Sequence, residues 1–274
     1  MCEDAGVTDA PAHQSRSGAQ AVERALAVLR GVEADEGGTG ITELAQRIGL
    51  TVSTTHRLAR ALTEAGLLLQ YPRTERYQLG PALVVLGNKA AQRLGYQHAL
   101  PLLEELAAAT GESINLGIRT GNEVQVVLDV TSHQPLRFNQ QSGSRVPMHV
   151  SAMGKCLLAA ADDIGEQIEQ LGDLVRATHR TITDRDQLRA ELELVRERGW
   201  ALNDEERNPG VRAIAAPVPA PTDGALGAIS IQGPTVRITD DRLPDLADLL
   251  HKTTNRVATL LATAPDVVRG AGRE

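Results

Sequence analysis

Hydroxyl, imidazole and guanidinium side chains gather in one short segment, residues 51–60. If residues 52–65 form a helix with one buried stripe, the polar residues outside that stripe must face outward. The buried stripe is expected to be Thr55, Leu58, Ala59 and Leu62. The outward face and its flanks are expected to comprise Thr51, Val52, Ser53, Thr54, His56, Arg57 and Arg60. Hydroxyls and helix-terminal N–H groups bind phosphates, and arginine binds phosphate or guanine, so this face favours contact with DNA.

The elements that must position this face also have a recognisable pattern. Apolar spacing predicts helices over residues 20–30 and 41–50; Thr42 is an N-cap or first-turn residue of the second and another candidate DNA contact. Gly49 ends that helix, and two short helices around a glycine-containing turn are typical of a helix-turn-helix. The alternative is a three-helix packing unit with exposed arginines.

A basic hairpin is expected directly after the third helix. Residues 67–71 and 77–79 have the composition of two short strands, and the segment between them contains proline and polar residues. Arg73 and Arg76 lie on this hairpin and are candidates for contact with the DNA backbone or minor groove. Turn, hydroxyl cluster and basic hairpin together favour a winged DNA-binding unit over the packing alternative.

The charge of the chain must be divided before it can be interpreted. The formal net charge is −7, which taken as a whole argues against a nucleic-acid binder. Residues 47–80, however, hold five arginines against Glu64 and Glu75, a local balance of +3. Local arginines are sufficient for phosphate contact, because counterion release depends on the contacts made and not on total charge.

The pattern changes to a mixed one after residue 100. A helix is expected over 81–94, a short helix ends near Gly111, and further helices are expected over 151–171, 184–198 and 240–262. The expected strands are residues 113–119, 123–130, 136–141, 200–203, 212–218 and 226–232. This order predicts a mixed antiparallel sheet flanked by helices, an α+β fold. No apolar run reaches the ~18 residues of a membrane span, so we expect no membrane partner and a cytoplasmic location.

Several segments resemble the IclR family of bacterial transcriptional regulators. The matching segments are residues 21–29, 43–66 and 77–80, then 151–159, 210–218 and 228–234. The most specific of them is Ser151-Ala-Met-Gly-Lys-Cys-Leu-Leu-Ala159, which is similar to the family's Thr/Ser-Ala-x-Gly-Lys-Ala-x-Leu-Ala element. The matching segments occur in the family's order from about residue 19 to 262.

The resemblance implies a winged helix-turn-helix, a linker helix that dimerises and a sensor domain shaped like a GAF or PAS domain. Residues 1–18 are polar and are expected to be a disordered tail. The further division expected is the DNA-binding domain (19–80), the linker helix (81–97), the effector-binding domain (98–264) and a flexible tail (265–274). The resemblance also implies a homodimer or dimer of dimers that binds a palindromic operator on double-stranded DNA, usually as a repressor. Effectors in the family are typically small organic acids or aromatic catabolites.

An effector site can be transferred residue by residue from the resemblance. Ser151-Ala-Met-Gly154 is expected to precede a helix whose free N–H groups suit a carboxylate. The residues implied to bind an effector are Phe138, Val146, Ala152, Met153, Gly154, Asn203, Val211, Ala213, Ser230 and Gln232. For each residue, core packing or turn geometry is an equally good interpretation. Asn203, Ala213 and Gln232 depart from residues found in some members, so no particular effector can be transferred.

Other chemistry finds little support. The phosphate-binding loop motif is absent around Gly154 and Lys155, and Cys156 is expected to be a buried thiol. No histidine pair has metal-ligand spacing, so no metal, cofactor or catalytic residue is predicted. The acids of residues 203–206 are expected to be exposed beside Arg207. The alternative function is an enzyme or ligand-binding protein whose helix-turn-helix serves only protein contacts.

Overall fold

The computed structural model describes residues 13–33, 35, 37–138, 140–222 and 224–262. The chain divides into two compact units, Met1–Ala90 and Ala91–Glu274. Within the described residues, no helix has both the length and the apolar character needed to cross a membrane.

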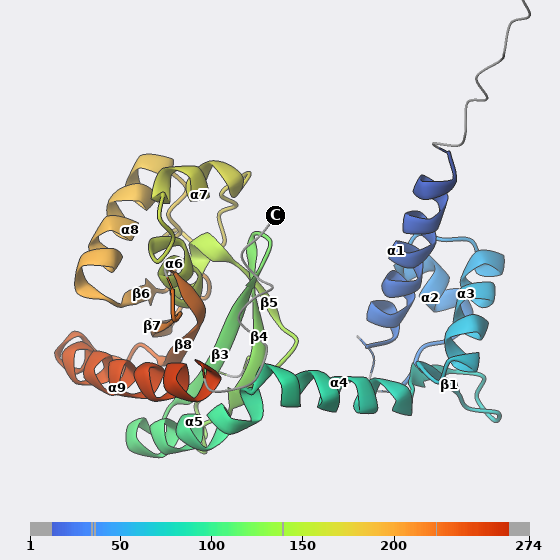
Figure 1. Ribbon diagram of the computed structural model, residues 1–274, viewed down its shortest axis with the longest axis horizontal. Helices are drawn as coiled ribbons and strands as arrows, with labels where there is room; N and C mark the ends of the chain where they lie inside the picture. The colour runs from blue at the N-terminus through green and yellow to red at the C-terminus, as the bar shows by residue number, and fades with distance from the viewer. Residues whose placement is uncertain (1–12, 34, 36, 139, 223, 263–274) are drawn as a thin grey trace, which may run out of the picture. The chain divides into compact units, whose positions relative to one another are not determined.

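The first unit is a winged helix-turn-helix, as predicted. Its helices are α1 (His13–Glu33), α2 (Ile41–Arg47) and α3 (Val52–Glu64), and its antiparallel hairpin is β1 (Leu68–Gln70) with β2 (Tyr77–Leu79). Figure 1 shows α2 and α3 packed beside α1. The side chains that fill the core between them are Val28, Val32, Leu44, Ala59, Leu62, Leu68 and Tyr77.

Helix α1 is longer than predicted. It begins at His13, so residues 13–18 belong to a helix and not to the tail assigned to 1–18; residues 1–12 lie outside the described part. Residues 13–18 contain no proline, and each residue added to an existing helix gains a hydrogen bond without a new nucleation cost. Gly18 alone, with its cost of ~1 kcal/mol, does not end such a helix.

The junction of the two units is helical. Helix α4 (Pro81–Leu94) begins at proline as predicted, and Gly95 with φ 69° separates it from α5 (Tyr96–Thr110). The linker helix therefore ends at residue 94 and not at 97. A left-handed residue breaks the helical hydrogen-bond ladder, and glycine adopts this conformation without steric cost.

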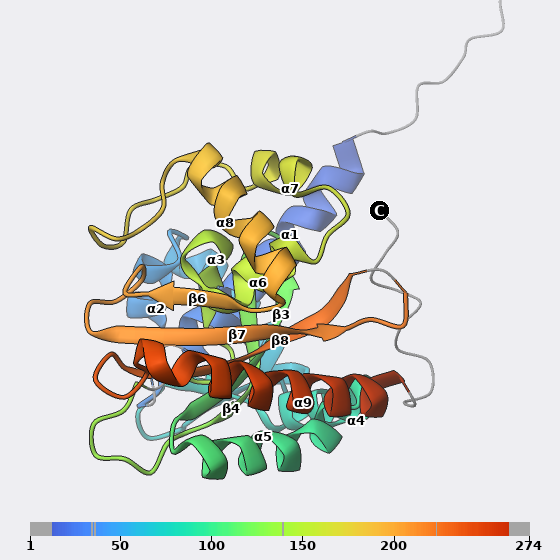
Figure 2. The same cartoon turned by 90° about the vertical axis from the view of Figure 1, so that its left-hand side faces the viewer.

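The second unit is built on an antiparallel sheet of order β5-β4-β3-β8-β7-β6. The strands are β3 (Ser113–Thr120), β4 (Glu123–Val130), β5 (Arg145–Pro147), β6 (Ala201–Asp204), β7 (Val211–Pro219) and β8 (Ala225–Pro234). The helices after α5 are α6 (Ala152–Ala159), α7 (Ile164–Gln170), α8 (Arg185–Arg198) and α9 (Leu243–Ala262). In Figure 2, α5 and α9 cover one face of the sheet, and α6, α7 and α8 cover the other. The predicted α+β class is confirmed.

Strand alternation divides the sheet residues between two cores. Ile229 and Ile231 of β8 pack with α5 and α9, whereas Ala228 packs with α6 and α8. Ser230 and Gln232 share the α6 face with Ala228, since successive side chains of a strand point to opposite faces. The larger apolar side chains therefore lie on the α5–α9 face, and polar ones are left on the other.

Three element predictions for this unit need correction. Residues 136–141 form no strand in their described part; β5 occupies the edge position instead. Ser142 donates its backbone N–H and its hydroxyl to Asp129 Oδ1 of β4, so the end of this segment is attached to β4 through a side chain. The helix expected over 151–171 is divided at residues 160–163, where Asp163 caps α7, and the last helix starts with a 3₁₀ turn over 240–242.

Candidate functional site

The N-terminal end of helix α3 is fixed by local chemistry. Thr51 is its N-cap, and the Thr51 hydroxyl accepts a hydrogen bond of 3.2 Å from the backbone N–H of Thr54. Gly49 in the preceding turn has φ 67°, with open space around its missing Cβ, so its role is conformational. Thr42 is expected either at the N-cap or in the first turn of α2. It lies in the first turn, because the N-cap of α2 is Gly40.

The predicted outer face of α3 is exposed. Thr51, Val52, Ser53, His56, Arg57 and Arg60 are exposed, and Thr54 is half-buried. Thr55, Ala59 and Leu62 are buried as predicted, while Leu58 is only half-buried. Among the described residues, Arg57 and Arg73 have no ion-pair partner, and Arg60 pairs only with Glu64, at 2.9 Å on the exposed surface. Arg57 on α3 and Arg73 on the hairpin are therefore the arginines of the predicted contact set that have no compensating carboxylate among the described residues.

Arg76 lies on the hairpin as predicted, but unlike Arg57 and Arg73 it has carboxylate partners. Its Nε donates to the carbonyl of Gly38 at 2.7 Å, and its terminal nitrogen lies 3.5 Å from Asp35 and 3.4 Å from Glu43. These contacts join the hairpin to α2 and to the loop before it. The guanidinium is occupied by two carboxylates, so Arg76 positions the wing and its charge is already compensated.

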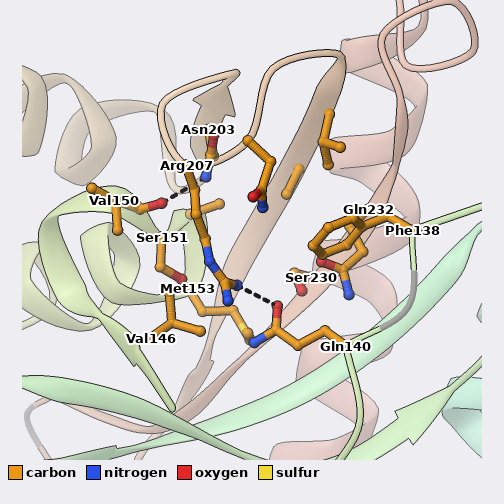
Figure 3. Close-up of a pocket in the computed structure, with 14 residues that line it drawn as sticks. Phe138, Gln140, Val146, Val150, Ser151, Met153, Asn203, Arg207, Ser230 and Gln232 are labelled. Carbon is orange, nitrogen blue, oxygen red and sulfur yellow. Dashed lines mark hydrogen bonds between the residues drawn. The ribbon is translucent and has the colours of Figure 1, made fainter. Parts of the chain in front are cut away.

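The second candidate site is a small cavity on the α6 face of the sheet (Figure 3). Asn203 of β6, Ala213 of β7 and Gln232 of β8 are register partners on adjacent strands and share this face. The space open to the centres of water-sized molecules is about 20 Å³. The lining residues are Phe138, Gln140, Val146, Val150, Ser151, Ala152, Met153, Asn203, Arg207, Asn208, Val211, Ala213, Ser230 and Gln232.

The cavity brings together nine of the ten residues transferred from the family, and Gly154 is the exception. A Cβ at Gly154 would lie 2.2 Å from the Met148 carbonyl oxygen, so this glycine allows α6 to pack against the preceding turn. Sequence reasoning missed Gln140, Val150, Ser151, Arg207 and Asn208. The alternation of Phe138 and Gln140 is a sequence signal for a shared face, but the same alternation predicts a strand.

Hydrogen bonds fix most of the polar groups around the cavity. Asn203 Nδ2 donates to the Val150 carbonyl at 2.6 Å, and Asn203 Oδ1 accepts from the Glu206 N–H at 3.0 Å. Gln232 Nε2 donates to Asn115 Oδ1. Asn203 therefore connects the start of α6 with the turn after β6, and Gln232 is held against β3.

Two polar groups at the cavity have no hydrogen-bond partner among the described residues: an amide donor and a hydroxyl. Gln140 Nε2 and Ser230 Oγ are buried with no hydrogen-bond partner among the described residues. Arg207 reaches across the cavity and donates to Gln140 Oε1 at 2.9 Å (Figure 3). Burial lowers the pKa of the Arg207 guanidinium, which marks the withdrawal of water from a charged group.

The acidic turn after β6 is not the exposed cluster predicted. Glu206 is buried and lies 2.6 Å from the Nζ of Lys155, which is itself only 1% exposed. Asp204 binds Arg212, and this hydrogen bond lowers the pKa of the carboxyl group. Lys155 and Glu206 are 51 residues apart, so no local pattern indicates the pair.

Cys156 is buried as predicted, and burial raises its pKa to about 12. Its thiol donates to the Ala215 carbonyl at 3.1 Å, which leaves it unsuited to act as a nucleophile. No group of three or more His, Cys, Asp or Glu side chains within the described residues is arranged to hold a metal ion.

The two sites can now be compared with known proteins. A family model described as "Bacterial transcriptional regulator IclR C-terminal" matches residues 92–259. The chain belongs to the IclR family. The family's helix-turn-helix domain model matches residues 21–72. The family consists of DNA-binding transcriptional regulators and not of enzymes, with an effector-binding C-terminal domain, so the enzyme alternative is set aside.

Individual members extend this match over nearly the full chain. The regulator BhcR of Paracoccus denitrificans is 34% identical over 256 residues, 92% of this chain and 91% of the relative. The repressor AllR of Escherichia coli K12 is 31% identical over 250 residues, 90% of this chain and 92% of the relative. An IclR homologue of Microbacterium hydrocarbonoxydans, solved with 4-hydroxybenzoate, shares the fold at TM-score 0.78 and 23% identity, covering 88% of this chain and 99% of its own.

Proposed function

We propose that this IclR-family regulator is a repressor that binds a palindromic operator as a homodimer or dimer of dimers. In this proposal, a small organic effector, a carboxylate or an aromatic catabolite, occupies the cavity and changes operator affinity. The observation that carries the proposal is the presence, in one chain, of an exposed cationic helix face and a cavity lined with unused hydrogen-bond donors.

The DNA contacts are assigned to α3 and the wing. Arg57 has an exposed side chain with no compensating carboxylate among the described residues, and His56 and Ser53 are exposed on the same helix. We assign Arg57 to a base edge or phosphate and Arg73 to the backbone, because uncompensated guanidinium groups neutralise phosphates most effectively. Arg76 is left out of the contact set, since Glu43 and Asp35 already hold it. A regulator of chromosomal DNA would act in the cytoplasm.

Dimerisation is assigned to α4. The helix has no buried residue, and Val84, Val85 and Leu86 are 63%, 55% and 58% exposed. A continuous exposed apolar stretch is typical of a protein–protein contact, which supports the packing of a second chain against α4. Two chains related by a twofold axis present two α3 helices, which is the arrangement that a palindromic operator requires.

The class of effector is assigned from the chemistry of the cavity lining and from one relative, and repression is assigned from another relative. Phe138 and Val146 supply apolar wall, while Gln140 and Ser230 supply unused polar atoms, a combination that suits a small organic molecule with an acceptor group. The Microbacterium homologue was solved with 4-hydroxybenzoate, and AllR is named a repressor. These two likenesses favour an organic-acid effector and repression.

The test is to recover bound genomic fragments with the full-length chain and to measure affinity for them by gel shift. Arg57→Ala should weaken binding by ~1–3 kcal/mol, and it should reduce the salt slope by about one if the side chain neutralises one phosphate. Arg189→Ala on α8 removes the same charge from an exposed site in the other unit and should change neither quantity. Equal weakening in the two variants would contradict the assignment of α3 as the reading element.

A further inference from the structure

Arg207 occupies an unusual position for a charged side chain. It starts in the turn after β6 and extends into the cavity past Ser151 and Met153 to Gln140 (Figure 3). Its neighbour Glu206 points the other way, to Lys155. The turn between β6 and β7 thus places an anion in the protein interior and a cation in the cavity.

The guanidinium is not compensated by a carboxylate. No Asp or Glu side chain of the described residues lies within 4.0 Å of it, although Glu205 and Glu206 precede it in the chain. Its hydrogen bond goes to the neutral amide oxygen of Gln140. A partly buried arginine without an acid is costly unless an anion is supplied, because burial penalises the charged form and arginine does not deprotonate.

Two further groups at the cavity have unused hydrogen-bonding capacity. Gln140 Nε2 can only donate a hydrogen bond, and this atom is buried without an acceptor among the described residues. Ser230 Oγ is also buried without a partner there, and the whole residue is 2% exposed. Buried polar atoms are normally paired with protein, water or ligand atoms, so these two groups are available to a ligand that enters the cavity.

We infer that Arg207 is the residue that makes the cavity selective for an anionic ligand, by pairing with its carboxylate in place of the Gln140 side chain. The inference rests on the proposed effector function and specifies which residue decides between an acid and its neutral analogue. Gln140 Nε2 and Ser230 Oγ are assigned to the ligand oxygens that face them.

The size of the cavity adds a mechanical consequence. Its 20 Å³ is little more than the ~10–15 Å³ that one water molecule needs. The Arg207 side chain lies across the cavity (Figure 3), so we expect a ligand larger than a few atoms to displace it from Gln140. The backbone of the turn stays in place, because Asn203 and Lys155 hold Glu206. The side chain of Arg207 therefore acts both as a plug and as the counter-ion of the ligand that displaces it.

The experiment is calorimetric titration of the full-length chain with matched acids and amides. The probes are acetate, propionate, benzoate and 4-hydroxybenzoate, each paired with its neutral amide. At least one acid should bind, and its amide should bind roughly 10- to 100-fold more weakly, the range expected when a charge-assisted hydrogen bond is removed. Arg207→Met should weaken that acid by a similar factor, and Arg189→Met, outside the cavity, should leave it unchanged.

A second variant keeps Arg207 and tests the same idea. Gln140→Glu places a carboxylate at the position of the present amide, 2.9 Å from the guanidinium, and should exclude the acid by occupying its counter-ion. Circular dichroism confirms that each variant is folded. The inference is overturned if amides bind as well as acids, if Arg207→Met binds the acid like the wild type, or if no acid binds.

The proposed function is tested separately in the same preparation. Operator binding by the wild-type chain without any acid tests the regulator proposal alone. Operator binding with no preference for acids refutes the role of Arg207 and leaves the regulator proposal standing. Selective acid binding without operator binding supports the role of Arg207 and refutes the regulator proposal.

Discussion

Lys155→Met is expected to be among the most destabilising single changes in the second unit. Lys155 is 1% exposed and the Glu206 side chain 8% exposed, with 2.6 Å between Nζ and Oε1; Glu191 lies 3.4 Å from the same nitrogen and also binds Arg198. At an effective dielectric constant of about 20, two unit charges 2.6 Å apart attract by about 6 kcal/mol. Desolvation of both ions offsets much of this attraction in the folded state.

Removal of Lys155 alone leaves the desolvation cost of Glu206 without the attraction of the Lys155 ammonium group that offsets it. Glu206 then remains buried without its nearest cation, and the free energy of unfolding should fall by ~3–5 kcal/mol. Lys155→Met combined with Glu206→Gln removes both charges and should recover most of that stability. The exposed pair Arg256–Glu105, at 56% and 58% exposure, provides the matched control. Arg256→Met should lower the free energy of unfolding far less than Lys155→Met does, because solvent screens an exposed pair.

The assay is urea unfolding followed by tryptophan fluorescence. Trp200 is the single tryptophan of the chain and lies in the second unit, 4.1 Å below the Arg198 guanidinium, so its emission reports on that unit alone. With an m-value of ~2 kcal/mol per molar urea, the Lys155→Met midpoint should fall by ~1–3 M. A midpoint as high as that of Arg256→Met, or a double variant as unstable as the single one, would refute the reasoning.

Three further perturbations test other parts of the structure. Gly154→Ala forces a Cβ to 2.2 Å from a backbone oxygen and should lower the free energy of unfolding by at least ~1–3 kcal/mol, measured by the same urea assay. Cys156, with a pKa of about 12, should resist iodoacetamide in the folded chain at pH 8 and react once urea unfolds it, as peptide mass spectrometry can show; labelling of the folded chain would contradict its burial. The pKa of Asp204 is lowered by Arg212, so its contribution to stability is complete above the unfolded value near 3.8 and disappears as pH falls through the lower folded value. Asp204→Asn should therefore make stability less sensitive to acid below pH 4, and an unchanged acid profile would argue against it.

Elements with strong local periodicity were predictable from the sequence. The stripe through Ala59 and Leu62 placed α3, and Gly49 marked the turn before it, because these features depend on neighbours within two helical turns. Strands β3 and β4 were found almost to the residue. Family resemblance supplied nine cavity residues that no local pattern identifies.

The features that were missed depend on distant partners. Phe138 and Gln140 alternate like a strand, yet their side chains line a cavity and the edge position is taken by β5. Glu206 looks like a solvated acid until Lys155 is brought beside it. Arg76 looks like a free cation on a wing until Glu43 and Asp35 are placed near it. In each case, the deciding interaction joins residues that no sequence window contains.

Operator affinity measured with and without the acid that binds the cavity tests the central claim most directly. Fluorescence anisotropy of labelled operator is followed at two salt concentrations, with unlabelled competitor DNA present. We expect saturable, competitor-resistant binding with a steep salt dependence, and a change of ~5- to 150-fold in affinity when the acid is added. If the acid binds the protein but operator affinity stays the same, or if the chain binds all DNA alike, control of this regulator by an effector in the cavity is contradicted.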